Sequence, residues 1–257
     1  MRIATWNLDH ASNGSRPIEL QIQKIISVSA DIIILTETCD EVNLLPYGYS
    51  YSHFSESNSY HKYCSAIWSK YPIVRAIKTY DPETATCAEI ASPLGKVIIY
   101  GTIITYFGDK GKDGTSPFWH EHHKAINDHG SDWKIIFSDE NVCRLPLIVA
   151  GDFNQPRDGS KYNKSKDGQN ISMLDEALMM NHLTCLTSED FGLAGKLNAD
   201  PKKGYIRSNI DHICMTTNAF SVDSVNAWNH FTEDNIYMSD HNGVYVDLST
   251  NSLQIPE

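Results

Sequence analysis

The chain has 257 residues, of which 41% are hydrophobic and 10% aromatic, so it can bury a sizeable core and is not of disordered composition. Its formal net charge is −11, and it lacks the basic stripe by which most duplex-binding proteins contact phosphates. Its apolar runs are far shorter than the ~20 residues of a membrane-spanning helix. These features exclude stable membrane insertion and argue against tight binding of duplex nucleic acid.

The cysteines and the first residues bear on the cellular compartment. The six cysteines are widely spaced and form no Cys-x-x-Cys pair, so we expect six free thiols in a reducing environment. A strand-like run begins directly after Met1 and leaves no room for a signal peptide. We therefore expect a cytoplasmic protein, and a monomer.

Strand-like runs rich in Ile, Val and Tyr recur along the whole chain. They cover residues 3–8, 31–36, 63–68, 86–91, 96–104, 147–151, 210–215, 222–228 and 243–248. Helical periodicity is clearest over residues 17–28, and residues 118–137 and 172–180 are two further expected helices. Many strands and few helices predict two β-sheets packed face to face with helices outside, in an α/β fold.

Five short polar clusters lie at the ends of apolar runs. They are Trp6-Asn7-Leu8-Asp9, Leu35-Thr36-Glu37-Thr38, Gly151-Asp152-Phe153-Asn154, Asn209-Ile210-Asp211-His212 and Ser239-Asp240-His241. Each supplies a carboxylate, and hard oxygen ligands of this kind suit Mg²⁺ or Mn²⁺ rather than Zn²⁺. Hydrolysis of a phosphate ester needs such an ion, a base for water and donors for the developing charge. Because the clusters must converge from both ends of the chain, we expect a single domain over residues 1–257.

Strand geometry predicts how two of these clusters are used. Residues i and i+2 of an extended strand share a face, so Asn7 and Asp9 point the same way. Gly151 allows a sharp exit from its strand that presents Asp152 and Asn154 together. Glu37 is expected to end the strand over residues 31–36.

The order and wording of the clusters resemble the endonuclease/exonuclease/phosphatase superfamily, from residue 3 to about residue 247. Residues 66–73 resemble its hydrophobic-x-Ser-Lys-x-Pro-Ile segment, and Pro156 follows the Gly-Asp-x-Asn motif as it often does there. The superfamily includes abasic-site endonucleases, DNase I-like nucleases, inositol-polyphosphate phosphatases, sphingomyelinases and deadenylases. The resemblance implies a four-layer α/β sandwich, in which two mixed sheets are flanked by helices. It also implies a Mg²⁺-dependent phosphoester hydrolase, foremost a nuclease-like phosphodiesterase, whose substrate is a phosphate ester such as nucleic acid.

The metal-binding roles in this interpretation fall on three carboxylates. Glu37 is the expected ligand of Mg²⁺, for which Mn²⁺ could substitute. Asp9 is a second ligand or a partner through water, and Asp240 lies near the metal or orients the water. Asn7 donates to the phosphate or binds the ion through its oxygen.

The catalytic roles fall on the remaining clusters. Asp152 orients or deprotonates the attacking water, and Asn154 donates to a phosphate oxygen. The resemblance pairs Asp211 with His241, and such a pairing fixes the tautomer of the imidazole and favours its charged form. Sequence leaves open whether Asp152 or His241 is the base.

The chain departs from one pattern of the family. Many members carry a histidine that acts on the leaving group, and Ile103 occupies that place here. Thr102, Thr105 or Tyr106 could substitute as residues that contact the substrate. His120 to His123 lack the spacing of a zinc motif, and that interpretation is not favoured.

Three alternatives remain open at this point. The protein could be a phosphomonoesterase or a lipid-headgroup phosphodiesterase of the inositol phosphate or sphingomyelin type. Lys161, Lys164 and Lys166 hint at an inositol phosphate. A non-catalytic binding protein on the same fold is the third alternative, against which the presence of every acid and of His241 argues.

Overall fold

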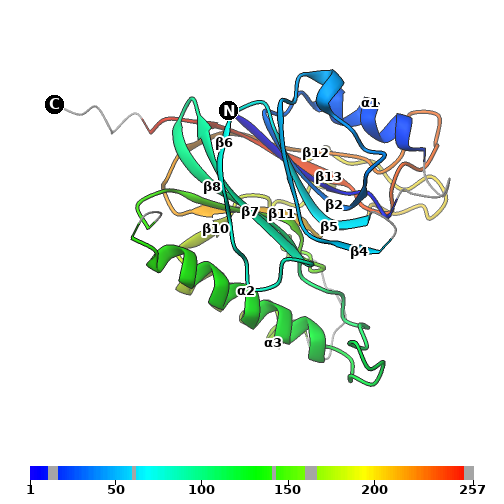
Figure 1. Ribbon diagram of the computed structural model, residues 1–257. Coiled ribbons are helices and arrows are strands. Elements are labelled where there is room, and N and C mark those ends of the chain that lie inside the picture. Colours follow the sequence, from blue (N-terminus) through cyan, green and yellow to red (C-terminus); the bar gives the residue numbers. More distant parts are fainter. Residues whose placement is uncertain (11–16, 60–61, 141–142, 160–166, 252–257) are drawn as a thin grey trace.

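The computed structural model describes residues 1–10, 17–59, 62–140, 143–159 and 167–251. Within them the strands form two mixed sheets (Figure 1). The first sheet has the order β12 (Ser221–Trp228), β13 (Gly243–Ser249), β1 (Arg2–Asn7), β2 (Ile32–Cys39), β5 (Lys62–Ser69) and β3 (Tyr51–Phe54), with β4 (Ser57–Ser59) also paired to β5. The second has the order β10 (Leu183–Cys185), β11 (Asp211–Thr216), β9 (Leu147–Asp152), β8 (Gly95–Ile103), β7 (Ala85–Ser92) and β6 (Ile73–Ile77). The pairs β1–β2 and β8–β9 are parallel, and the other pairs are antiparallel.

Helices cover the outer faces of both sheets (Figure 1). Helix α1 (Ile18–Val28) lies on the first sheet, and α2 (His120–Ser138) and α3 (Asp167–Met180) lie on the second. A short 3₁₀ turn, η1, covers Leu45–Tyr47. The layers are therefore helix, sheet, sheet and helices, which confirms the expected four-layer α/β sandwich.

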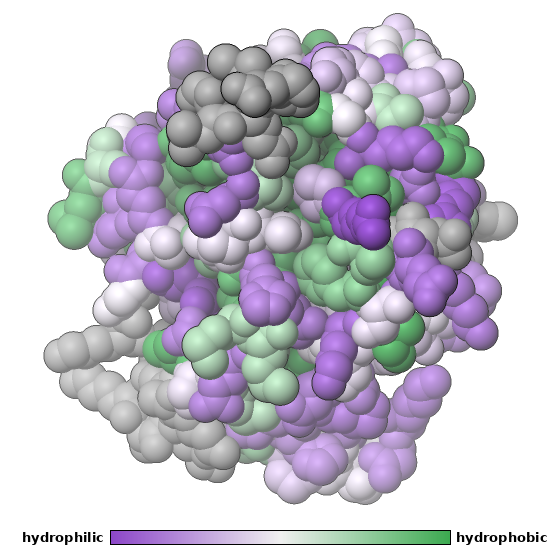
Figure 2. All heavy atoms as spheres, turned by 90° about the vertical axis from the view of Figure 1, so that its left-hand side faces the viewer, coloured by the Kyte–Doolittle hydropathy of each residue, from purple (hydrophilic) through white to green (hydrophobic). Residues whose placement is uncertain are grey.

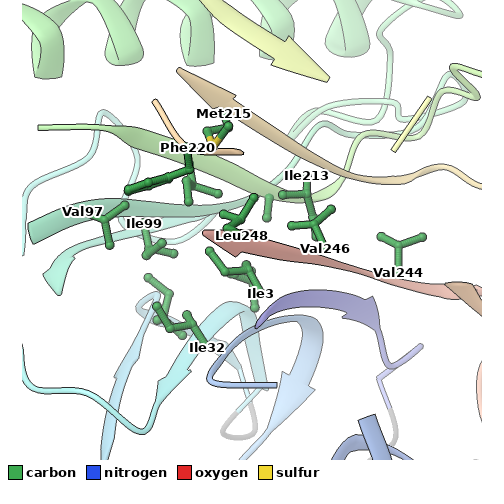
Figure 3. Packing of buried hydrophobic residues seen from close by; sticks show 14 of the residues in the cluster. Ile3, Ile32, Val97, Ile99, Ile213, Met215, Phe220, Val244, Val246 and Leu248 are labelled. Carbon is green, nitrogen blue, oxygen red and sulfur yellow. The ribbon is translucent and has the colours of Figure 1, made fainter. Parts of the chain in front are cut away.

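The central core lies between the two sheets (Figure 3). Ile32 and Ile34 of β2 face Ile99 of β8 and Ile213 of β11 across this layer. The alternate residues of the same strands, such as Ile33, pack outward against a helix. Period-two alternation in strands that are apolar on both faces thus builds three apolar layers from two sheets.

The second outer layer contains the two longest helices. Ile126 and Trp133 of α2 and Leu174 of α3 pack with Tyr100 of β8 and Val149 of β9. Burial of large side chains of this kind contributes about 1.5–3 kcal/mol each. All three layers therefore support the strands that carry the polar clusters.

The structure corrects the sequence interpretation at several element bounds. Strand β2 continues to Cys39, so Glu37 does not end it. Sequence reasoning missed four short strands, namely β3, β4, β6 and β10. The expected helix over residues 172–180 begins at Asp167. Lys161, Lys164 and Lys166 lie outside the described residues.

The surface is mostly polar. Figure 2 shows one face on which hydrophilic side chains predominate and hydrophobic ones form small separate groups. None of the helices in the described part of the chain is both long and apolar enough to cross a bilayer.

Gly151 is required by the close pairing of β8 and β9. Its φ is +145°, and a Cβ atom built on it would lie 1.8 Å from the backbone oxygen of Thr102. We expect Gly151→Ala to lower the free energy of unfolding by about 3 kcal/mol or more, because strain adds to a backbone clash. Urea unfolding followed by circular dichroism measures this loss.

Gly48→Ala is the matched control for this prediction. Gly48 also has a positive φ, of +90°, but an added Cβ would meet nothing within 4 Å. The loss of stability in Gly48→Ala therefore reports only the cost of a positive φ in a residue that has a Cβ atom. Equal losses of stability in the two variants would show that the approach of β8 to β9 is not the constraint.

Candidate active site

Polar side chains continue the inward-facing rows of both sheets at one end of the core. Ile3 and Asn7 share a face of β1, and Ala150 and Asp152 share a face of β9. Ile3 and Ala150 belong to the layer between the sheets. Asp211 begins β11 directly opposite Asp152 in the strand register. The core therefore ends in buried polar groups that come from both sheets.

His241 meets two of these carboxylates. Its Nδ1 lies 2.6 Å from Oδ2 of Asp211, and its Nε2 lies 3.9 Å from Oδ2 of Asp152. Asp240 Oδ1 lies 3.7 Å from the same Nε2. His241 precedes β13 of the first sheet, whereas Asp211 begins a strand of the second. The structure thus brings together the predicted pair of Asp211 and His241.

The loop that carries His241 is fixed to β1. The Ser239 hydroxyl donates to the backbone oxygen of Asn7 at 2.6 Å and accepts the backbone N–H of His241 at 3.0 Å. The indole of Trp6 donates to the backbone oxygen of His241 at 2.7 Å. These buried bonds fix the backbone of His241 against β1.

The electrostatics of the imidazole follow from its two carboxylate neighbours. Burial by itself would lower the pKa of His241, but the charges of Asp211 and Asp152 outweigh it and raise the pKa to about 10. Burial raises the pKa of Asp152 to about 7, although His241 acts in the opposite direction. The site therefore favours an imidazolium at neutral pH.

Asn7 bridges the two sheets beside this pair. Its Nδ2 donates to Oε1 of Glu37 at 3.1 Å and to Oδ2 of Asp152 at 3.2 Å. Its Oδ1 accepts the backbone N–H of Asp9 at 2.8 Å. We call Asn7, Asp152, Asp211 and His241 the polar seam.

Asn154 is held against the seam. Its side-chain amide donates to Oδ2 of Asp152 at 2.9 Å and to the backbone oxygen of Ile104 at 3.0 Å. Its backbone N–H donates to Oδ1 of Asp152 at 2.7 Å. Both side-chain hydrogens thus have acceptors within the protein.

The donor set fits a divalent cation. Asp9, Glu37 and Asp240 line the same cleft, and Oδ1 of Asp211 is buried without a hydrogen-bond partner. The ligand atoms of Asp152, Asp211 and His241 lie within 4.8 Å of one another. Since Asp211 and His241 are already hydrogen-bonded to each other, the cleft carboxylates are the better placed ligands. An oxygen-rich set of this kind suits a hard ion.

Four residues of the site have a strained backbone. Asp9, His10, Glu37 and Asn154 have positive φ values of 51°, 44°, 48° and 51°, which non-glycine residues rarely adopt. Strain of this kind is found where a side chain must be aimed at a functional site. In β2, Thr36 and Thr38 pair with β5, and the positive φ of Glu37 takes this residue out of that pairing.

His10 is a site residue that sequence reasoning missed. Its Nε2 lies 3.2 Å from Oε2 of Glu37. It follows Asp9 directly in the Trp6-Asn7-Leu8-Asp9 cluster, so the only signal was adjacency to a recognised motif.

The cleft above the seam has a volume of about 730 Å³. Residues from two loops line it. The first loop contributes Tyr106 and Phe107, and the second contributes Tyr205, Ile206, Arg207 and Ser208. Arg207 donates to the backbone oxygen of Asp240. Apart from His241, it is the one basic residue among the described residues that line the cleft. Sequence reasoning did not single out Arg207.

The three expected substrate contacts do not lie together. Tyr106 lines the cleft and is 53% exposed. The hydroxyl of Thr102 is buried and lies 2.8 Å from Nε2 of His129, and the hydroxyl of Thr105 donates to Asp109 at 2.6 Å. Neither threonine lines the cleft.

One histidine of the His120 to His123 cluster, His122, has a structural role. His122 is buried, with Nδ1 2.5 Å from the backbone oxygen of Thr105, and burial lowers its pKa to about 4. Its Nε2 lies 2.7 Å from Nε2 of Gln155, the residue after Asn154. His122 thus supports two segments that border the cleft.

Comparison with solved structures shows the same fold in several other proteins. An endonuclease/exonuclease/phosphatase from Beutenbergia cavernae DSM 12333 matches with a TM-score of 0.67 and 19% identity, over 98% of this chain and 72% of that one. A humanized D. rerio TDP2 matches with a TM-score of 0.65 and 13% identity, over 97% and 99%. A variant of the 3′ phosphatase NExo from Neisseria, bound to a product DNA hairpin, matches with a TM-score of 0.64 and 16% identity, over 97% and 99%.

Sequence comparison defines the family. No curated protein sequence matches the chain. The family model described as endonuclease/exonuclease/phosphatase family matches residues 4–241, which include all five polar clusters. The protein is therefore a member of the endonuclease/exonuclease/phosphatase family, a family of metal-dependent phosphoesterases.

Proposed function

We propose that this protein is a Mg²⁺-dependent phosphodiesterase with nuclease-like chemistry, which acts as a monomeric single domain in the cytoplasm. One observation carries the proposal. The hydrogen-bonded pair of Asp211 and His241 points Nε2 at Asp152, beneath a cleft lined by Asp9 and Glu37. Base, charged donor and metal ligands are the parts that phosphoester hydrolysis needs.

Glu37 and Asp9 would hold the ion, with Asp240 beside them. When bound, the ion supplies Lewis-acid stabilisation of negative charge on the phosphate oxygens. Mg²⁺ is the better choice because these ligands are hard oxygen donors, and Mn²⁺ could replace it.

The remaining roles fall on the polar seam. Asp211 holds Nδ1 of His241 and stabilises the charged imidazole, so we assign His241 to the negative charge that develops on the phosphate. Asp152, which faces Nε2 of His241, then accepts the proton of the attacking water. The amide of Asn7 lies between Glu37 and Asp152 and positions both carboxylates.

The cleft favours a small or single-stranded phosphodiester over a duplex. Arg207 is the one arginine among the described residues that line it and offers little neutralisation for a long phosphate backbone. The net charge of −11 also opposes a polyanion. Tyr106 and Tyr205 are 53% and 57% exposed at the cleft. Such rings offer a surface on which an unpaired base or another flat group can stack.

A phosphomonoester is the second candidate substrate. A 3′ phosphatase is among the proteins of similar structure, which supports this candidate. Ile103 argues against it, because it stands where many family members carry a histidine that acts on the leaving group. The leaving-group contact would then fall to Tyr106 or to water.

A substrate panel with Mg²⁺ and with Mn²⁺ tests the proposal. It contains abasic duplex, single-stranded DNA, RNA, nucleotides, inositol phosphates and sphingomyelin. We expect metal-dependent cleavage of a single-stranded or small phosphodiester. Release of inorganic phosphate alone would favour the monoester candidate, and no turnover on any member would favour a binding protein.

Glu37→Gln tests the metal site. We expect loss of divalent-ion binding in calorimetry and a fall in turnover of roughly 10²-fold or more, because the ion contributes several kcal/mol of charge stabilisation. Glu41→Gln is the matched control, since Glu41 is exposed and lies outside the cleft. Unchanged Mg²⁺ or Mn²⁺ affinity in Glu37→Gln would remove Glu37 from the ligands.

Double-mutant analysis tests whether Asp211 and His241 act as one unit. We expect His241→Ala and Asp211→Asn to reduce turnover by similar factors, and the double variant to lose little more, because coupled residues are not additive. Fully multiplicative losses would mean that the two residues work independently.

The pH–rate profile of Asp211→Asn provides a further prediction. The charge of Asp211 raises the pKa of His241, so its removal lowers that pKa. The alkaline limb, at which the imidazolium loses its proton, should therefore move to lower pH than in the wild type. If the alkaline limb stays in place in Asp211→Asn, that limb belongs to another group.

A further inference from the structure

Two of the free cysteines face each other on the opposite side of β11 from the polar seam. All six cysteines are free, and Cys185 of β10 lies directly opposite Cys214 of β11 in the strand register. Each of these two thiols shifts the pKa of the other, downward for Cys185 and upward for Cys214. Cys185 is partly exposed on an edge strand, whereas Cys214 is buried.

The register places this pair where a disulfide is geometrically allowed. The backbone N–H of Leu186 donates to the oxygen of Ile213 at 2.9 Å, which makes Cys185 and Cys214 a non-hydrogen-bonded pair of an antiparallel ladder. In such pairs the Cα atoms are about 4.5 Å apart and the side chains are closest. A disulfide spans Cα separations of about 4.4–6.8 Å, so the pair can be bridged without moving either strand far.

The neighbours of Cys185 activate its sulfur. Its Sγ lies 4.0 Å from the hydroxyl of Thr187, and that hydroxyl lies 3.1 Å from Nδ1 of His212. The hydrogen bond from Cys214 and the neighbouring His212 hold the pKa of Cys185 well below its usual range, although burial acts in the opposite direction. Burial and the bond to Cys185 raise the pKa of Cys214. Cys185 is thus the nucleophile and Cys214 keeps the proton.

The position of the pair connects it to the cleft. Cys185 and Cys214 border residues 186–213, which include Tyr205, Arg207 and Asp211 of the cleft and the seam. In addition, Nε2 of His212 donates to the backbone oxygen of Gln155, directly after Asn154. A covalent link between the two cysteines would fasten both ends of the segment that forms one wall of the cleft.

We propose that Cys185 and Cys214 form a redox modification site, at which a hydroperoxide converts the two thiols into a disulfide. The Cys185 thiolate attacks a peroxide oxygen, the O–O bond breaks, and water or an alcohol leaves, with a sulfenic acid on Cys185. The Cys214 sulfur then attacks that sulfenic sulfur, the S–O bond breaks, and the hydroxide leaves as water with the proton of Cys214 as the S–S bond forms. The two thiols lose two electrons and two protons, which reduce the peroxide. The disulfide closes residues 186–213 into a loop and stabilises the cleft wall.

Oxidation of the intact protein with stoichiometric hydrogen peroxide tests the site. We expect the wild type to lose two of its six thiols and to yield one cross-linked peptide pair that contains Cys185 and Cys214. The Tm should rise by roughly 5 °C or more because the unfolded chain is constrained, and dithiothreitol should reverse both changes.

Three variants separate this site from general thiol oxidation. Cys143 is exposed, so Cys143→Ser is the matched control and should still lose two thiols. Cys214→Ala should stop at a sulfenic acid on Cys185 that dimedone traps, and Cys185→Ala should form no cross-link. Recovery of Cys185 and Cys214 as separate thiols in the peroxide-treated wild type would overturn the proposal. A cross-linked protein with unchanged Tm would overturn the stabilisation of the wall.

Discussion

The two sheets are joined by hydrogen bonds at the end of the core where the polar clusters meet. Asp211 of the second sheet lies 2.6 Å from His241, in the loop that leads into β13 of the first sheet. Asn7 of the first sheet donates to Asp152 of the second at 3.2 Å. Neither partner in these bonds can be placed without the packing of the other sheet. The apolar layer between the sheets therefore determines the geometry of the site as well as the stability of the fold.

This arrangement concentrates charge where water is scarce. Asp152, Asp211 and His241 are all buried, and a buried carboxylate is costly unless it is paired. The imidazolium compensates part of the negative charge, and Oδ1 of Asp211 still has no hydrogen-bond partner. The remaining negative charge at the cleft fits a divalent cation, and Glu37, one of the carboxylates that line the cleft, has a strained backbone.

Sequence reasoning identified the clusters because each lies at one end of an apolar run. Alternation along the strands paired Asn7 with Asp9, and the family resemblance paired Asp211 with His241. The structure brings Asn7, Asp152, Asp211 and His241 into contact. Alternation of apolar residues could not show that β2 continues past Glu37. Glu37 leaves the strand geometry only through its own positive φ, and Thr36 and Thr38 on either side of it remain paired.

Other parts of the site depend on tertiary contacts that no local pattern encodes. Thr102 sits near a family motif, but its hydroxyl turns toward His129 of α2 and away from the cleft. Arg207 enters the cleft from a polar loop without a recognisable motif. The contact of Cys185 with Cys214 rests on β10, a strand of three residues that is too short for periodicity to reveal.

The protonation state of His241 tests the account most directly. Nitrogen-15 NMR of the imidazole in the metal-free protein reports whether Nδ1 and Nε2 both carry hydrogen across a pH titration. If Asp211 and Asp152 surround this ring as described, it stays charged at neutral pH and titrates at about pH 10. A titration near the ordinary histidine value of about 6.5 would contradict the polar seam as the link between the sheets and as the source of the site's charge.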